Sequence, residues 1–90
     1  MTPDEREVQR ARTRFVAWLR WYMTAYPEKA PSQNALARLL GITSAGMSYL
    51  FETNSTRLPR FDTLLAARRV LGFSLDYMLF NDPPTNVGQK

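Results

Sequence analysis

The chain has 90 residues, enough for one domain with one modest core, and its 44% hydrophobic and 22% charged contents are those of an ordinary folded protein. It has no cysteine and no histidine, which excludes disulfides and thiolate metal sites and removes the commonest general base. Twelve Lys and Arg against eight Asp and Glu give a net charge of +4, which favours a polyanionic partner such as nucleic acid.

The sequence does not predict a cluster of catalytic residues. The carboxylates are scattered, and there is no Gly-rich phosphate loop and no EF-hand pattern. No apolar run is long enough to span a membrane, and the acidic N-terminus is unlike a secretory signal. We therefore expect no enzyme, no metal, no cofactor and a cytoplasmic location, with which the absence of cysteine is compatible.

The first predicted element is a helix of about 24 residues, twice the usual length. It begins at Thr2, because Thr2-Pro3-Asp4-Glu5 is a capping box with proline at the first helical position, and it ends before Pro27. Apolar residues recur at steps of three or four, which is one helical face. This face comprises Val8, Ala11, Phe15, Trp18, Leu19, Tyr22 and Tyr26.

Basic side chains also line this first helix. Arg6, Arg10 and Arg14 form one row four residues apart, with Arg12 beside it, and a solvated face is favoured over contact with phosphates. Trp21 and Met23 lie off the apolar stripe. They are either ordinary surface or a patch that meets a partner chain.

Two short helices are predicted next. Ser32 is a typical N-cap for a helix over residues 33–40, and Gly41 ends that helix. Thr43 then caps a helix over residues 44–52. Two helices joined by about three or four residues that include a glycine have the spacing of a helix-turn-helix, here over residues 33–52.

The residue types within this unit fit that motif. Ala37 is small enough for the point where the two helices cross, and Gly41 can adopt the positive φ that the turn needs. Apolar residues are needed to hold the helices together. Those expected to do so are Leu36, Leu40, Ile42, Met47 and Leu50.

The rest of the chain predicts two more helices and a tail. Gly72 separates the helices, and Ser74 caps the second of them. The segments are a polar loop over 53–60, a helix from about 60 to 71, a helix over 75–80 and a flexible tail over 81–90. Residues 1–80 are therefore expected to form one all-α domain of five helices.

Two stretches resemble a known family. "SQNALARLLGITSAGMSYL" is similar to the lambda-repressor/Cro class of helix-turn-helix proteins (XRE type), and "LPRFDTLLAARRVLGFSLDYML" resembles the part that follows it in that family. The matching residues are Ser32, Gln33, Leu36, Ala37, Leu40, Gly41, Ser48, Pro59, Phe61, Leu64, Ala66 or Ala67, Leu71, Gly72, Asp76, Tyr77, Met78 and Leu79.

The resemblance covers roughly residues 10–80 and implies a lambda-repressor-like domain of five helices. Such domains bind duplex DNA, usually as a two-fold dimer on a near-palindromic site. Three features depart from the family: the first helix is extended, the loop after residue 52 is longer, and Phe51-Glu52-Thr53 replaces the usual Glu-x-Gly. These departures concern the dimer geometry and the path of the loop.

The resemblance also implies which residues contact DNA. Gln33 is expected to bond a phosphate, helped by free N–H groups at the helix start, and the loop residues to meet the backbone and the minor groove. The expected contacts are Gln33, Thr43, Ser44, Ala45, Ser48, Tyr49, Asn54, Arg57 and Arg60. Other interpretations stay open: Thr43 as a cap alone, Ser48 as a packing residue, and Tyr49 as a surface aromatic or packed on the fourth helix. Arg57 and Arg60 can also be charges that serve solubility alone.

The predicted reading helix has few side chains that discriminate between bases. "ITSAGMSYL" has no Arg, Lys, Gln or Asn, whereas Ser discriminates weakly and Ala45 can only contact a thymine methyl. Gly46 has no side chain, which would let the helix approach the groove. Specificity is then expected to come partly from Arg57 or Arg60 near a narrow minor groove and from DNA shape.

Two functions follow as hypotheses. The first is a sequence-specific transcriptional regulator, a repressor acting as a homodimer on duplex DNA at the nucleoid. The second is a protein-interaction module, such as an antitoxin or phage accessory protein, that keeps the helix-turn-helix fold. The lack of base-reading side chains in the third predicted helix and the aromatic residues of the first helix favour the second hypothesis.

Overall fold

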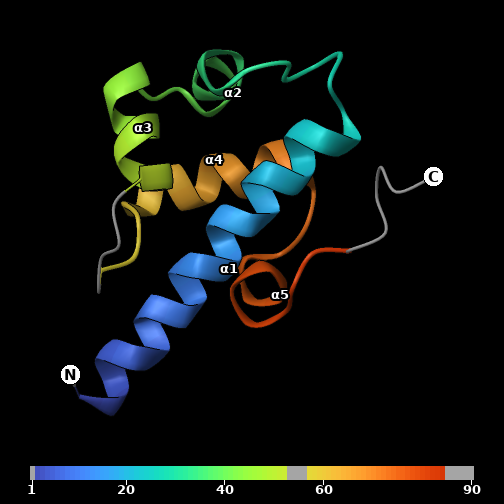
Figure 1. Cartoon of the computed structure of the whole chain (residues 1–90). Coiled ribbons are helices and arrows are strands. Elements are labelled where there is room, and N and C mark those ends of the chain that lie inside the picture. Colours follow the sequence, from blue (N-terminus) through green and yellow to red (C-terminus); the bar gives the residue numbers. More distant parts are fainter. Residues whose placement is uncertain (1, 53–56, 85–90) are drawn as a thin grey trace.

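In a computed structural model, residues 2–52 and 57–84 are described, and this part of the chain is all-helical (Figure 1). It comprises α1 (Pro3–Ala25), α2 (Gln33–Leu40), α3 (Ser44–Glu52), α4 (Phe61–Leu71) and α5 (Leu75–Phe80). The prediction of an all-α domain with five helices is confirmed for these residues. Asn54, one of the predicted DNA contacts, lies outside them.

The start of α1 has the predicted capping box. The Thr2 hydroxyl accepts a hydrogen bond from the Glu5 amide at 3.1 Å, and the Thr2 amide donates to Glu5 Oε1 at 2.9 Å. These two bonds satisfy amide groups that a helix start leaves without partners. The helix ends at Ala25, two residues before Pro27.

The other helix ends follow the same local chemistry. The hydroxyls of Ser32, Thr43 and Ser74 each accept a hydrogen bond from the amide three residues on, at 3.2, 2.9 and 3.2 Å. Gly41 and Gly72 follow α2 and α4 with φ of 74° and 85°, a region that costs other residues a clash with Cβ.

The core lies where α1 crosses the other helices. Figure 1 shows α1 running diagonally across the molecule, with α5 against it and α4 behind. Helix α2 packs on α3 and α4, and α4 on α5. The largest fully buried side chains are Phe15, Trp18, Leu19, Leu36, Met47 and Met78.

Aromatic rings join α1 to the segment around α5. Trp18 packs on Phe73 with a centroid separation of 4.7 Å and on Trp21 at 5.3 Å. Trp21 in turn contacts Tyr26 edge-on at 6.1 Å. Both Trp21 and Met23 are half-buried against the core, so neither forms a free surface patch.

The segment after α5 is held against α1. The Trp18 indole N–H donates to the Asn81 carbonyl oxygen at 2.8 Å, and Arg14 Nε lies 3.5 Å from Asp82 Oδ1. Asn81 and Asp82, the first two residues of the predicted flexible tail, therefore contact the folded body, whereas residues 85–90 lie outside the described residues.

Some apolar residues do not face the core as predicted. The helical spacing of Phe61, Leu64, Leu65 and Leu71 predicts one apolar face for the fourth helix, yet Phe61 and Leu65 are 68% and 42% exposed, and Tyr26 is 39% exposed. In α4 the inward face is instead made by Leu64 and its small neighbours, because α2 and α5 pack closely on that side. Helix α4 begins at Phe61, one residue later than predicted, with Arg60 as its N-cap.

None of the helices formed by residues 2–52 and 57–84 combines the length and the apolarity needed to cross a membrane.

Candidate nucleic-acid interface

The turn between α2 and α3 is closed by two backbone hydrogen bonds. The Ile42 amide donates to the Ala37 carbonyl at 3.0 Å and the Gly41 amide to the Arg38 carbonyl at 3.2 Å. This pair of bonds is a Schellman motif, which depends on the left-handed conformation of Gly41. Ala37 is 2% exposed, as expected of the small residue at the helix crossing.

Helix α3 divides into a buried and an exposed side. Met47 and Leu50 are 0% and 6% exposed and anchor the helix. The predicted reading residues lie on the other side: Thr43, Ser44 and Ala45 are exposed, Tyr49 is 59% exposed and Ser48 is half-buried. No acidic side chain lies between residues 43 and 49.

Gly46 lies close to the cap of its own helix. A Cβ at this position would lie 3.2 Å from Thr43 Oγ1, the atom that accepts the Gly46 amide hydrogen bond. The absence of a side chain therefore protects the N-cap, a role that the sequence did not reveal. Gly46 is half-buried, so it is a poor candidate for direct contact with a ligand.

Two arginines of α1 hold the C-terminal end of α3. Arg12 Nη2 donates to the Leu50 carbonyl at 3.3 Å, and Arg20 Nη2 donates to the Phe51 carbonyl at 3.3 Å. The Arg20 guanidinium also lies over the Phe51 ring, 4.8 Å from its centroid. Because the last carbonyls of a helix carry partial negative charge and α3 has no basic residue in its last turn, these cations stabilise it.

Arg12 also connects α3 to the chain before α4. Its Nη1 donates to the Arg57 carbonyl at 3.5 Å, and its guanidinium lies 5.8 Å from the centre of the Tyr49 ring. Arg12 is only 5% exposed, so the prediction that it belongs to a solvated arginine face is wrong. A guanidinium has five N–H donors in a fixed plane, which suits it to bridging several carbonyls.

A cavity of about 570 Å³ lies between α3 and the start of α4. Of the predicted contact residues, it brings together Thr43, Tyr49, Arg57 and Arg60. Arg60 is 86% exposed at its side chain and lies 3.6 Å from Asp62, an ion pair that water screens strongly.

Several predicted contacts lie outside this cavity. Ser44, Ala45 and Ser48 are on the neighbouring turns of α3, and Gln33 is half-buried at the start of α2. The candidate surface is therefore a strip along α3 that continues into the residues before α4. It offers hydroxyls, one phenol and guanidinium groups, which donate hydrogen bonds to anions.

In the part of the chain that the structure describes, no three His, Cys, Asp or Glu side chains are grouped so as to hold a metal ion.

Arg12 is the residue of this site that the sequence misassigned, although the sequence held one signal of its place. It precedes Leu19 by seven residues, which places it next to the apolar stripe on a helix.

Comparison with family models, with curated proteins and with solved structures found no match for this chain. The candidate interface therefore rests on the geometry of α2, α3 and the residues before α4.

Proposed function

We propose that this protein is a sequence-specific regulator of transcription that binds duplex DNA through α3. The observation that carries the proposal is the exposed side of α3 over residues 43–49, which has no acidic side chain and follows the closed turn after α2. The guanidinium groups of Arg57 and Arg60 lie beside it. A helix presented in this way can enter the major groove.

The proposal extends to the lambda-repressor/Cro-like class. The order of five helices, the left-handed Gly41 and the caps at Ser32 and Thr43 support it. In such a complex Tyr49 and Ser48 would face base edges, Arg60 would meet the DNA backbone, and the protein would repress as a homodimer on a near-palindromic operator.

Base readout would be limited in this arrangement. The exposed side of α3 offers the hydroxyls of Ser44 and Ser48, the methyl of Ala45 and the phenol of Tyr49. None of these makes the bidentate contacts that discriminate best between base pairs. Specificity would therefore depend partly on groove width and on how readily the site deforms.

Selection of bound duplexes from a random library tests the proposal. A regulator should enrich one motif, and a dimer should enrich two half-sites about one helical turn apart. Affinity should also fall steeply as salt rises, because phosphate contacts release counterions. No enrichment, together with no retention on duplex DNA at about 50 mM salt, would reject the proposal.

A protein-interaction module remains the second candidate because of an exposed apolar strip. Phe61 and Leu65 lie four residues apart on α4 and are 68% and 42% exposed, and Leu58 before them is 37% exposed. The aromatic residues of α1 no longer favour this candidate, because Phe15, Trp18 and Tyr22 are buried. Phe61→Ser would weaken partner capture in this case and leave duplex binding unchanged.

A further inference from the structure

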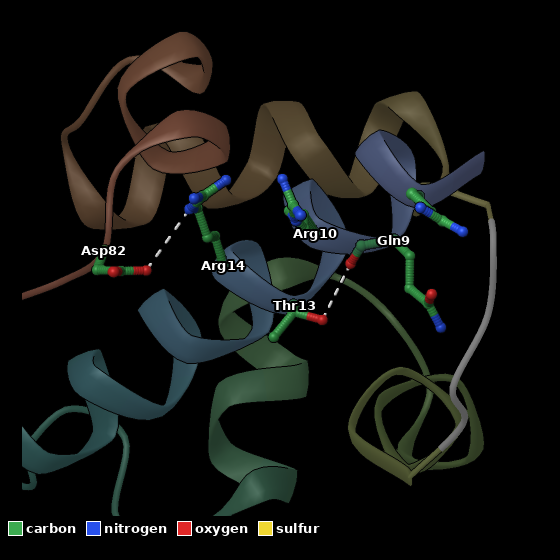
Figure 2. Close-up of a pocket in the computed structure, with 6 residues that line it drawn as sticks. Gln9, Arg10, Thr13, Arg14 and Asp82 are labelled. Carbon is green, nitrogen blue, oxygen red and sulfur yellow. Dashed lines mark hydrogen bonds and ion pairs between the residues drawn. The ribbon is translucent and has the colours of Figure 1, made fainter. Parts of the chain in front are cut away.

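A second groove, of about 520 Å³, runs along the N-terminal half of α1. Figure 2 shows Arg10 and Arg14 extending to the same side of the helix, with Asp82 of the C-terminal segment facing Arg14. The residues that line the groove are Arg6, Gln9, Arg10, Thr13, Arg14 and Asp82.

The three arginines of this groove are regularly spaced. They are four residues apart on one helix, which places successive side chains about 6 Å apart along the axis. Within the described residues, Arg14 pairs with Asp82, whereas the side chains of Arg6 and Arg10 make no hydrogen bond or ion pair. The Asp82 carboxylate thus occupies one end of the arginine row, and the other two guanidinium groups can bind further carboxylates.

The row faces away from the candidate nucleic-acid interface. Arg10 and Arg12 are two residues apart, which on a helix is a rotation of about 200°. Arg12 points to α3, where it bonds the Leu50 carbonyl, so Arg10 points to the opposite flank of α1. A duplex bound along α3 would leave this flank available to a different partner.

We propose that the groove binds an extended acidic segment of a partner protein, with carboxylates at every second residue. Alternate side chains of an extended chain are about 6.6 Å apart on one face, which matches the spacing of the arginines. Guanidinium groups bind carboxylates with paired, charge-assisted hydrogen bonds. The Asp82 carboxylate already lies beside Arg14 at one end of the groove, so it competes with the partner segment for this arginine.

Two labelled peptides test the match in spacing with the full 90-residue chain. The first is Gly-Ser-Glu-Ser-Glu-Ser-Glu-Ser-Gly, and the second, Gly-Ser-Ser-Glu-Glu-Glu-Ser-Ser-Gly, has the same composition and charge. Fluorescence anisotropy at low salt should show that the first peptide binds about 3-fold or more tightly than the second, because only the first can pair with all three arginines at once.

Substitutions in the chain test whether the spaced peptide binds in the groove. Arg10→Gln should weaken binding of the spaced peptide by about 2- to 5-fold, the effect of one exposed ion pair. Arg69→Gln, which removes an exposed arginine of α4, is the matched control and should leave it unchanged. Asp82→Asn should tighten binding by about 2-fold, because it removes the internal competitor. If Arg10→Gln lost helicity, Arg6→Gln would replace it in the peptide-binding test.

Three outcomes would overturn the proposal. The first is equal affinity for the two peptides, and the second is an equal loss of peptide affinity in Arg10→Gln and Arg69→Gln. The third is no binding of either peptide at about 1 mM, a concentration at which even weak specific binding is detectable. The same variants are titrated with a duplex. If Arg10→Gln weakened duplex binding and left the peptide unaffected, the row would be a nucleic-acid contact. These outcomes are independent of whether α3 binds DNA, which Arg60→Ala tests separately.

Discussion

Arg12→Met should destabilise the fold measurably. The substitution keeps a long apolar side chain but removes the donors to the Leu50 and Arg57 carbonyls, at 3.3 and 3.5 Å. A charged donor contributes about 1.5–3 kcal/mol per hydrogen bond at good geometry, and because both bonds are longer than usual we take about 1 kcal/mol for each. The free energy of unfolding should fall by about 2 kcal/mol, which lowers the Tm by roughly 8–16 °C.

Urea unfolding followed by far-ultraviolet circular dichroism measures this loss. Arg20→Met is the matched control: Arg20 bonds the next carbonyl of α3, but it is exposed, so its loss should be below about 1 kcal/mol. Arg12→Lys keeps the charge without the planar fork and should fall between the wild type and Arg12→Met. Equal stabilities of Arg12→Met and Arg20→Met would refute the reasoning, because relief of charge burial would then have cancelled the lost bonds.

Three further outcomes are expected. Arg60→Ala should weaken binding to all duplexes alike and reduce the slope of log affinity against log salt by about 1, while Arg69→Ala leaves both unchanged; a sequence-dependent loss would argue against a backbone contact. Tyr49→Ala should lower the ratio of specific to non-specific affinity in competition assays, and equal losses would make Tyr49 a phosphate contact. Gly41→Ala should cost about 1 kcal/mol in thermal unfolding, because φ is 74° with open space around the Cβ; a stabilised variant would contradict that conformation.

The helix boundaries were predictable because they depend on local chemistry. A hydroxyl at Ser32, Thr43 or Ser74 needs only the amide three residues on, and a glycine such as Gly41 needs only its own backbone freedom. Neither depends on distant parts of the chain, so sequence and structure agree at these positions.

The role of Arg12 was not predictable from spacing alone. Its spacing from Leu19 places it next to the apolar stripe, but the α3 carbonyl that it bonds is 38 residues away in the sequence, and only tertiary packing brings the two together. Tertiary packing likewise determines that Phe61 faces solvent while Trp21 packs on Phe73, because the faces of α1 and α4 that become covered depend on where α5 lies. Of the candidate site, the exposed side of α3 was predictable, and the cavity beside it was not.

The aromatic cluster also gives the protein an optical reporter of one half of its fold. The chain has two tryptophans, Trp18 and Trp21, and both are packed against Phe73 in the region that joins α1 to α5. Tryptophan fluorescence will therefore respond when α1 and the segment around α5 separate. Coincident fluorescence and circular dichroism transitions would mean that the two halves unfold as one cooperative unit.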